Sequence, residues 1–278
     1  MLPASLGRPL ARAAAARPWC PSSADPRANA GSGADAGRPR YEVVYAHPSD
    51  RTSRVDRVAP ALDAAVAADQ HSVAGEAGGL RTIRFHRGTP CSDTGLAVGV
   101  VALPKTRDEY VVGGVPDLVA VRGAVWLAMG DGHAAARNVL IYADYLGGDS
   151  GLLGQGEMWQ GEAADDATDS VYDDGGLSAV VWAPAEDTDF LASLPATILH
   201  EVGHTLGAVS PNAPHGSAGF HCADGVDVMC YDDGTLSSPM FDRCPGPEDE
   251  VGARFDCGHD DYFSPNPAPG SYLATHLN

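Results

Sequence analysis

Residues 195–207 read PATILHEVGHTLG, and the rest of the fold is best understood from this stretch. Apolar residues such as Ile198 and Val202 recur at helical spacing, which predicts an amphipathic helix. The helix is expected to begin near Pro195 and to end before Gly207, because proline fits the first turn of a helix and glycine fits the position after its end. The sequence therefore places one well-defined helix in the second half of the chain.

Three polar residues on this helix carry chemistry. His200 and His204 lie one turn apart and therefore share a face of the helix. Two imidazoles in this arrangement can bind the same Zn²⁺ ion. Glu201 follows the first histidine, where its carboxylate can accept a proton from a zinc-bound water molecule. The HExxH pattern thus predicts a catalytic zinc site rather than a plain surface helix.

The same stretch resembles a known family. HEVGHTLG at residues 200–207, followed by Val-Met-Cys-Tyr at 228–231, is similar to the metzincin metallopeptidases, and specifically to divergent secreted members of actinobacterial type. The resemblance is sharp over residues 195–231 and only architectural over residues 41–190. It implies a secreted hydrolase that binds one catalytic zinc ion and cleaves peptide bonds by attack of a zinc-bound water molecule.

The resemblance also implies a role for each matching residue. His200 and His204 would bind the zinc ion, and Glu201 would be the general base. Met229 would be the turn methionine beneath the metal, which is also a plain packing role. Tyr231, two residues later, matches a tyrosine that in some members approaches the zinc and the oxyanion of the transition state.

The third zinc ligand departs from the family pattern. The family takes it from the third residue after the glycine, which here is Ser210, a poor zinc ligand. The remaining candidates further along the chain are His215, His221, Asp224 and Asp227. We favour His221, because it lies eight residues before Met229, a spacing like that of matrixins. It also precedes Cys222, whose disulfide would fix its backbone. His215 is the main alternative.

The flanking sequence predicts an α/β fold with a twisted mixed sheet, a backing helix and the active-site helix, followed by an irregular disulfide-linked region. Strands are expected at Tyr41–Ala46, Leu80–His86, Ala97–Ala102, Ala124–Ala128, Val139–Tyr142 and Ala179–Trp182. The backing helix is expected from Val55 to just before Gly75, with a start or kink at Pro60, and a long loop between Gly147 and Gly176. Residues 41–278 would form one catalytic domain with subdomains at 41–207 and 208–278.

The leader region is expected to stay outside this domain. Residues 1–40 hold arginines and a Pro-, Gly-, Ser- and Ala-rich stretch, which is typical of a leader or linker rather than a folded element. A clear secretory signal is not recognisable there. Cys20 lies in this region, and a cysteine switch onto zinc is conceivable, although a tail disulfide or a free thiol is the simpler interpretation.

The composition excludes several classes of function. The chain has 18 basic and 37 acidic residues, a formal charge of −19. Residues 1–137 carry 16 basic and 13 acidic groups, whereas residues 138–278 carry only two basic against 24 acidic groups. Such a field repels polyanions, so we expect no nucleic-acid partner. No apolar run is long enough to cross a membrane, and a monomer acting on a peptide or protein substrate is expected.

The six cysteines predict an oxidising compartment. Four of them, Cys222, Cys230, Cys244 and Cys257, lie in the loop-rich last quarter, and we expect at least two disulfides that involve them. A second, weaker metal prediction falls on Asp165–Asp174 (DDATDSVYDD), which offers carboxylates to Ca²⁺ but lacks the spacing of an EF-hand. The alternative function is a secreted, non-catalytic binding or adhesion domain whose zinc site is structural or degenerate.

Overall fold

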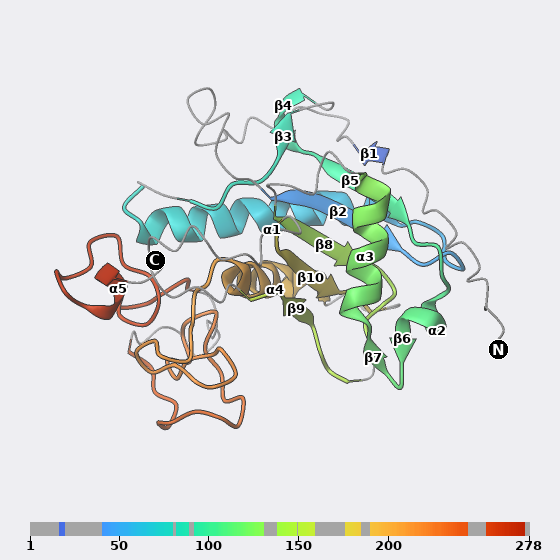
Figure 1. Cartoon of the computed structure of the whole chain (residues 1–278). Coiled ribbons are helices and arrows are strands. Elements are labelled where there is room, and N and C mark those ends of the chain that lie inside the picture. Colours follow the sequence, from blue (N-terminus) through green and yellow to red (C-terminus); the bar gives the residue numbers. More distant parts are fainter. Residues whose placement is uncertain are drawn as a thin grey trace, which may run out of the picture.

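A six-stranded sheet forms the centre of the computed structural model, with the strand order β1-β5-β2-β8-β10-β9 (Figure 1). In this order the strands are Arg17–Trp19, Val98–Ala102, Glu42–His47, Val139–Ala143, Ser178–Trp182 and Gly154–Gly156. The four central strands are parallel, and β1 and β9 are antiparallel to their neighbours at the two edges. The structure describes residues 17–19, 41–79, 82–88, 92–130, 138–148, 150–158, 176–184, 190–243 and 254–275.

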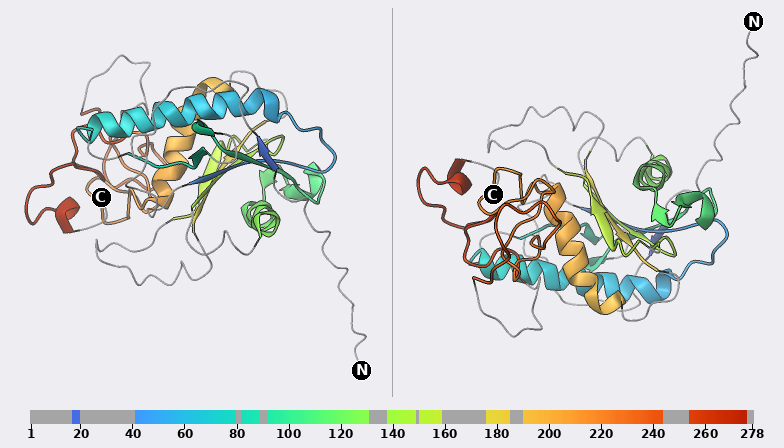
Figure 2. Two further views of the ribbon diagram at one scale, coloured as in Figure 1. Left: turned by 90° about the horizontal axis from the view of Figure 1, so that it is seen from above. Right: turned by 90° about the horizontal axis from the view of Figure 1, so that it is seen from below.

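Helices cover both faces of this sheet. The long helices α1 (Val55–Glu76) and α4 (Phe190–Thr205) lie on one face, and α3 (Leu118–Met129) lies on the other (Figure 2). Every residue of β8 and β10 is buried, as expected for parallel strands that are covered on both sides. The remaining elements are α2 (Arg107–Tyr110), α5 (Tyr272–Thr275) and two small hairpins, β3–β4 (Arg87–Gly88 and Ser92–Leu96) and β6–β7 (Val111–Val112 and Val115–Pro116).

The predicted mixed α/β sheet is confirmed, with two errors in its elements. Ala124–Ala128 was expected to be a strand but belongs to helix α3. The reason is visible in its burial: Val121, Ala124 and Val125 are the buried residues, at a helical spacing, and Asp117 caps the helix by accepting the N–H of Ala120. The other predicted strand, Leu80–His86, is irregular over its described residues, where only Phe85 forms an isolated bridge, to Tyr41.

The helix limits also differ from expectation. Helix α1 continues through Pro60 and past Gly75 to Glu76. Helix α4 begins at Phe190, so Pro195 lies inside it rather than in its first turn. The stretch expected to be one loop between Gly147 and Gly176 contains strand β9, and the Asp165–Asp174 candidate for Ca²⁺ lies outside the described residues.

The C-terminal region is built differently. After α4, the described chain consists of turns and isolated bridges until the four-residue helix α5. A disulfide joins Cys222 to Cys230, and Cys257 is also disulfide-bonded, which supports the expectation of disulfides in this region. Cys20, Cys91 and Cys244 lie outside the described residues.

Two further findings concern the start of the chain and membranes. Strand β1 comes from the segment expected to be a leader or linker, and it pairs with β5. The rest of residues 1–40 lies outside the described part of the chain. No described helix combines the length and apolar character that crossing a bilayer requires.

Candidate metal centre

Three histidines meet at the C-terminal half of α4. His200 and His204 come from the helix, and His221 comes from the loop that follows it. One ring nitrogen from each histidine lies within 4.8 Å of the others. The ring centroids are 4.9 Å apart for His200 and His204, 5.3 Å for His200 and His221, and 5.2 Å for His204 and His221. The structure thus brings His221 to the helix pair.

Hydrogen bonds orient two of these rings. Nδ1 of His200 donates to the carbonyl oxygen of Val228 at 2.6 Å, which leaves Nε2 as its lone-pair nitrogen. Nδ1 of His221 donates to Oδ2 of Asp233 at 2.9 Å. Metal-binding histidines are commonly held in this way by a carbonyl or a carboxylate on their second nitrogen. Ser217 donates a further hydrogen bond to Asp233, at 2.5 Å, which fixes the carboxylate in turn.

The electrostatic environment favours neutral imidazoles. Burial lowers the pKa of His200 to about 4 and the pKa of His204 well below its usual value. Burial also lowers the pKa of His221, against the opposing effect of Asp233. These shifts favour the neutral imidazole, which keeps one N–H and is the form that binds a metal ion.

Met229 packs against helix α4 at Gly203, next to His204. The methionine is fully buried, and a Cβ atom placed on Gly203 would overlap its sulfur. Gly203 of α4 therefore lets the methionine approach the helix between the two histidine positions. The disulfide links Cys222, next to the third histidine, with Cys230, next to Met229, and so ties that histidine to the segment of the methionine.

Glu201 is buried beside strand β9. Burial raises its pKa to about 8, and a hydrogen bond from the backbone N–H of Gly156 opposes this shift. A Cβ atom on Gly154 would overlap the Glu201 carboxylate, and one on Gly156 would lie 2.5 Å from the Glu201 carbonyl oxygen. Both glycines are thus required for β9 to lie against α4 at this point.

Tyr231 forms an open side of the cluster. Its side chain is among the exposed large residues, at 47% exposure. Its ring centroid lies 4.1 Å from that of His221 and 5.7 Å from that of His200. Burial of the ring, followed by the nearby charge of Glu201, raises the pKa of the tyrosine, so its hydroxyl is a proton donor at neutral pH.

The other ligand candidates lie elsewhere. Nδ1 of His215 lies 2.5 Å from Oδ1 of Asp261 and is not part of the three-histidine group. Asp224 and Asp227 are fully buried and group with Cys257 instead. His221, and not His215, is therefore the residue that the fold brings to the helix pair.

Two features of the site were missed by sequence reasoning. Asp233 carries no distinguishing signal, because an Asp-Asp-Gly stretch is typical of an exposed turn. Gly154 and Gly156 lie in a segment interpreted as loop, although glycine on either side of a single residue is a signal of close backbone approach.

Comparison with known proteins finds no relative: no family model, no curated protein and no solved structure matches the chain.

Proposed function

We propose that this protein is a secreted zinc-dependent endopeptidase of metzincin type. The observation that carries the proposal is the convergence of His200, His204 and His221 beside the buried carboxylate of Glu201. The half-exposed Tyr231 borders the same place, with its ring centroid 4.1 Å from that of His221.

The donor set fits zinc. Three neutral imidazoles and one open position are the usual protein contribution to a catalytic zinc site. When bound there, zinc would polarise a substrate carbonyl and lower the pKa of a water molecule to near neutrality. The hydrogen bonds from His200 to Val228 and from His221 to Asp233 orient the rings for this role.

Glu201 is placed to move the proton. Its buried carboxylate accepts a hydrogen bond from the backbone N–H of Gly156, which fixes the orientation of the side chain. A proton taken from the attacking water would then be passed to the nitrogen of the leaving amine. The hydroxyl of Tyr231 would donate a hydrogen bond to the carbonyl oxygen as negative charge develops on it.

Strand β9 supports a peptide as the substrate class. It is the last strand in the sheet order, and its glycines pack directly on Glu201 and His204. An extended peptide that pairs with the side of β9 facing away from β10 would run past the three histidines. The position of β9 beside the histidines therefore favours an endopeptidase over a hydrolase of small molecules.

The decisive experiment separates zinc binding from catalysis. Glu201→Gln keeps the size of the side chain, so we expect it to retain zinc while casein hydrolysis falls about 10²–10⁴-fold, the usual contribution of a general base. Asp108→Asn, whose side chain is 90% exposed on α2, is the matched control and should keep full activity.

The wild-type protein decides between an enzyme and a binding domain. Hydrolysis that stops with a chelator and returns with zinc supports the proposal. A wild-type protein that holds zinc tightly but cleaves no peptide would instead favour the non-catalytic binding domain. Undiminished hydrolysis by Glu201→Gln would remove Glu201 from the mechanism.

A further inference from the structure

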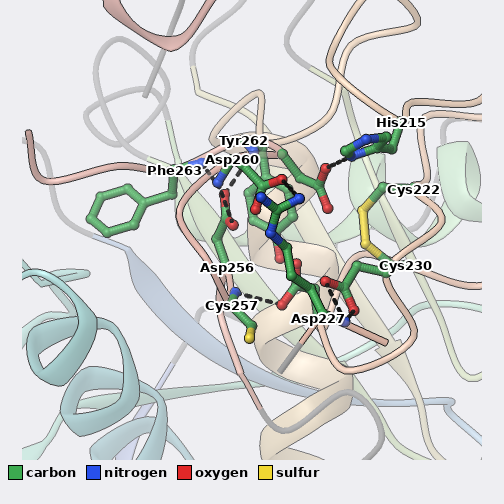
Figure 3. Close-up of polar contacts among 12 residues, drawn as sticks. His215, Cys222, Asp227, Cys230, Asp256, Cys257, Asp260, Tyr262 and Phe263 are labelled. Carbon is green, nitrogen blue, oxygen red and sulfur yellow. Dashed lines mark hydrogen bonds and ion pairs between the residues drawn. A yellow bond between two sulfur atoms is a disulfide. The ribbon is translucent and has the colours of Figure 1, made fainter. Parts of the chain in front are cut away.

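A second polar cluster lies in the C-terminal region, around the disulfide (Figure 3). Its acidic residues come from two segments, residues 224–227 and residues 256–261. Four carboxylates in it are almost completely inaccessible: Asp224, Asp227, Asp256 and Asp261. A fifth, Asp260, is 24% exposed. So many buried acids in one place need compensation, because an unpaired buried charge is very costly.

Two of these carboxylates are satisfied by backbone groups. Asp256 accepts the N–H groups of Asp260, Tyr262 and Phe263, and so closes the turn that contains them. Asp224 accepts the N–H of Arg243, at 3.2 Å to one oxygen and 3.3 Å to the other. These two acids have structural roles in holding loops, and a ligand is not needed to explain them.

Three other carboxylate oxygens in the cluster are not explained by backbone N–H donors. Oδ2 of Asp227, Oδ1 of Asp260 and Oδ2 of Asp261 are buried, and none of them has a hydrogen-bond partner among the residues that the structure describes. Asp261 is only 1% exposed; within the described part of the chain its Oδ1 contacts Nδ1 of His215 and its Oδ2 accepts no hydrogen bond. Buried carboxylate oxygens in native proteins are normally paired, so these unpartnered oxygens point to a ligand.

The side chains nearby supply too little positive charge. Arg243 contacts Oδ2 of Asp260 at 2.8 Å, and His215 contacts Asp261. Arg243 and His215 thus face a group of five carboxylates, and a cation would add the positive charge that these two side chains do not supply.

We propose that His215, Asp260 and Asp261 bind a second divalent metal ion, Zn²⁺. One ligand atom from each of the three lies within 4.8 Å of the others, and the group shares no residue with the three-histidine centre. His215 is 35% exposed and Asp260 partly so, which gives an ion a path to the buried Asp261. A nitrogen donor with two carboxylates suits zinc, whereas Ca²⁺ takes oxygen ligands.

The position of this site suggests what the ion would do. A carboxylate oxygen of Asp261 lies within 4.8 Å of the sulfurs of Cys222 and Cys230. His215 belongs to the same loop as His221, six residues earlier. A metal ion here would join that loop to the segment around residue 261 and so act with the disulfide to hold His221 in place. The second ion would be structural rather than catalytic.

The alternative is a plain ion pair, in which a protonated His215 neutralises Asp261 without a metal. Zinc stoichiometry by mass spectrometry after dialysis separates the two, in a cycle of His221→Ala, His215→Ala and the double variant. We expect two zinc ions per wild-type chain, one in each single variant and none in the double variant. Asp242→Asn, an exposed acid of the same subdomain, is the matched control and should keep two.

Each outcome has a separate meaning. If His215→Ala retains as much zinc as the wild type, the second site is refuted, whatever His221→Ala does. If His221→Ala keeps two zinc ions while His215→Ala keeps one, the second site stands and the proposed catalytic centre is wrong. Near-UV circular dichroism checks that the variants are folded, and Asp260→Asn, at the more exposed ligand, repeats the test with a milder change. Calcium retained in place of zinc by the dialysed wild type would overturn the choice of ion.

Discussion

Residues 41–207 and the described residues after 207 reach similar burial by different means. In the first region Ile141 and Trp182 are fully buried between a parallel sheet and its helices. In the second, Cys222 and Asp256 are equally buried, but the chain there has only the short helix α5. The first region is held by apolar packing and sheet hydrogen bonds. The second also buries apolar side chains such as Phe255 and Phe263, but in place of a sheet it has a disulfide and carboxylates that accept backbone N–H groups.

The difference matters because the candidate metal centre lies across the boundary. His200, Glu201 and His204 stand on a helix that the sheet supports, so their relative positions are fixed by regular structure. His221 and Tyr231 stand on loops, and their positions depend on covalent and polar links. The loop half of the site should therefore be the half that fails first when its links are removed.

The largest effect should come from removing the disulfide. Replacing Cys222 and Cys230 together by alanine loses a crosslink worth about 2–4 kcal/mol of stability. We expect the loss to concentrate in the C-terminal loops, so that amide exchange speeds up around His221 while β8 and β10 stay protected. Zinc affinity should fall with it.

The contrast between the two regions is wrong if removal of the disulfide speeds up amide exchange equally in both. Equal acceleration of exchange in β8 and in the loops would mean that both regions unfold as one unit and that the disulfide supports the whole domain. The same measurement on Asp242→Asn gives the baseline for a neutral change in the loop region.

A smaller effect is expected from Asp233, which orients His221 without touching the proposed metal. Asp233→Asn keeps the shape but weakens the charge-assisted hydrogen bond to Nδ1 of His221, at 2.9 Å. Loss of such an orienting partner typically lowers metal affinity about 10–100-fold. Zinc competition titrations should show this, whereas Asp232→Asn, at the exposed neighbouring acid, should bind as the wild type does. Equal affinity of both variants would show that the disulfide alone positions His221.

The sequence predicted the first region better than the second, for a physical reason. The strands at residues 139–142 and 179–182 were found because continuous apolar runs are required where a strand is buried on both faces. Ala124–Ala128 was misassigned because a short apolar run in a buried helix looks the same as a strand. Strand β9 was missed because glycines, which let it approach Glu201, are also the residues of loops.

In the candidate site, the residues set by local sequence spacing could be predicted, whereas the contacts between residues far apart in the sequence could not. The spacing of His200 and His204 follows from the helix itself. The preference for His221 over His215 came from its neighbours in the sequence, and the structure does bring His221 to the pair. The contact of Asp233 with His221 spans 12 residues of loop, and nothing in the composition of that loop encodes it.

The smallest predicted effect concerns Asp69, a buried acid of α1 in the sheet region. Burial raises its pKa well above the usual value, and its Oδ2 has no hydrogen-bond partner among the described residues. The folded chain therefore keeps this proton to a higher pH than the unfolded chain does. The contribution of Asp69 to stability is thus fully present below the unfolded pKa and is lost as the pH rises through the folded pKa, by at most about 1.4 kcal/mol per pH unit.

Asp69 sharpens the comparison because, unlike the acids around Asp261, it belongs to neither of the candidate metal groups described above. We expect Asp69→Asn to flatten the decline of unfolding free energy above pH 4, to the same extent with zinc and with a chelator, in urea titrations across pH. Asp108→Asn, at an acid whose side chain is 90% exposed, should leave the profile unchanged. If the effect of Asp69→Asn disappears when zinc is present, the metal ions and the sheet region are coupled, and the two regions do not balance their buried charges independently. A wild-type profile that is already flat in chelator would mean instead that the carboxyl of Asp69 finds a compensating partner in the folded chain.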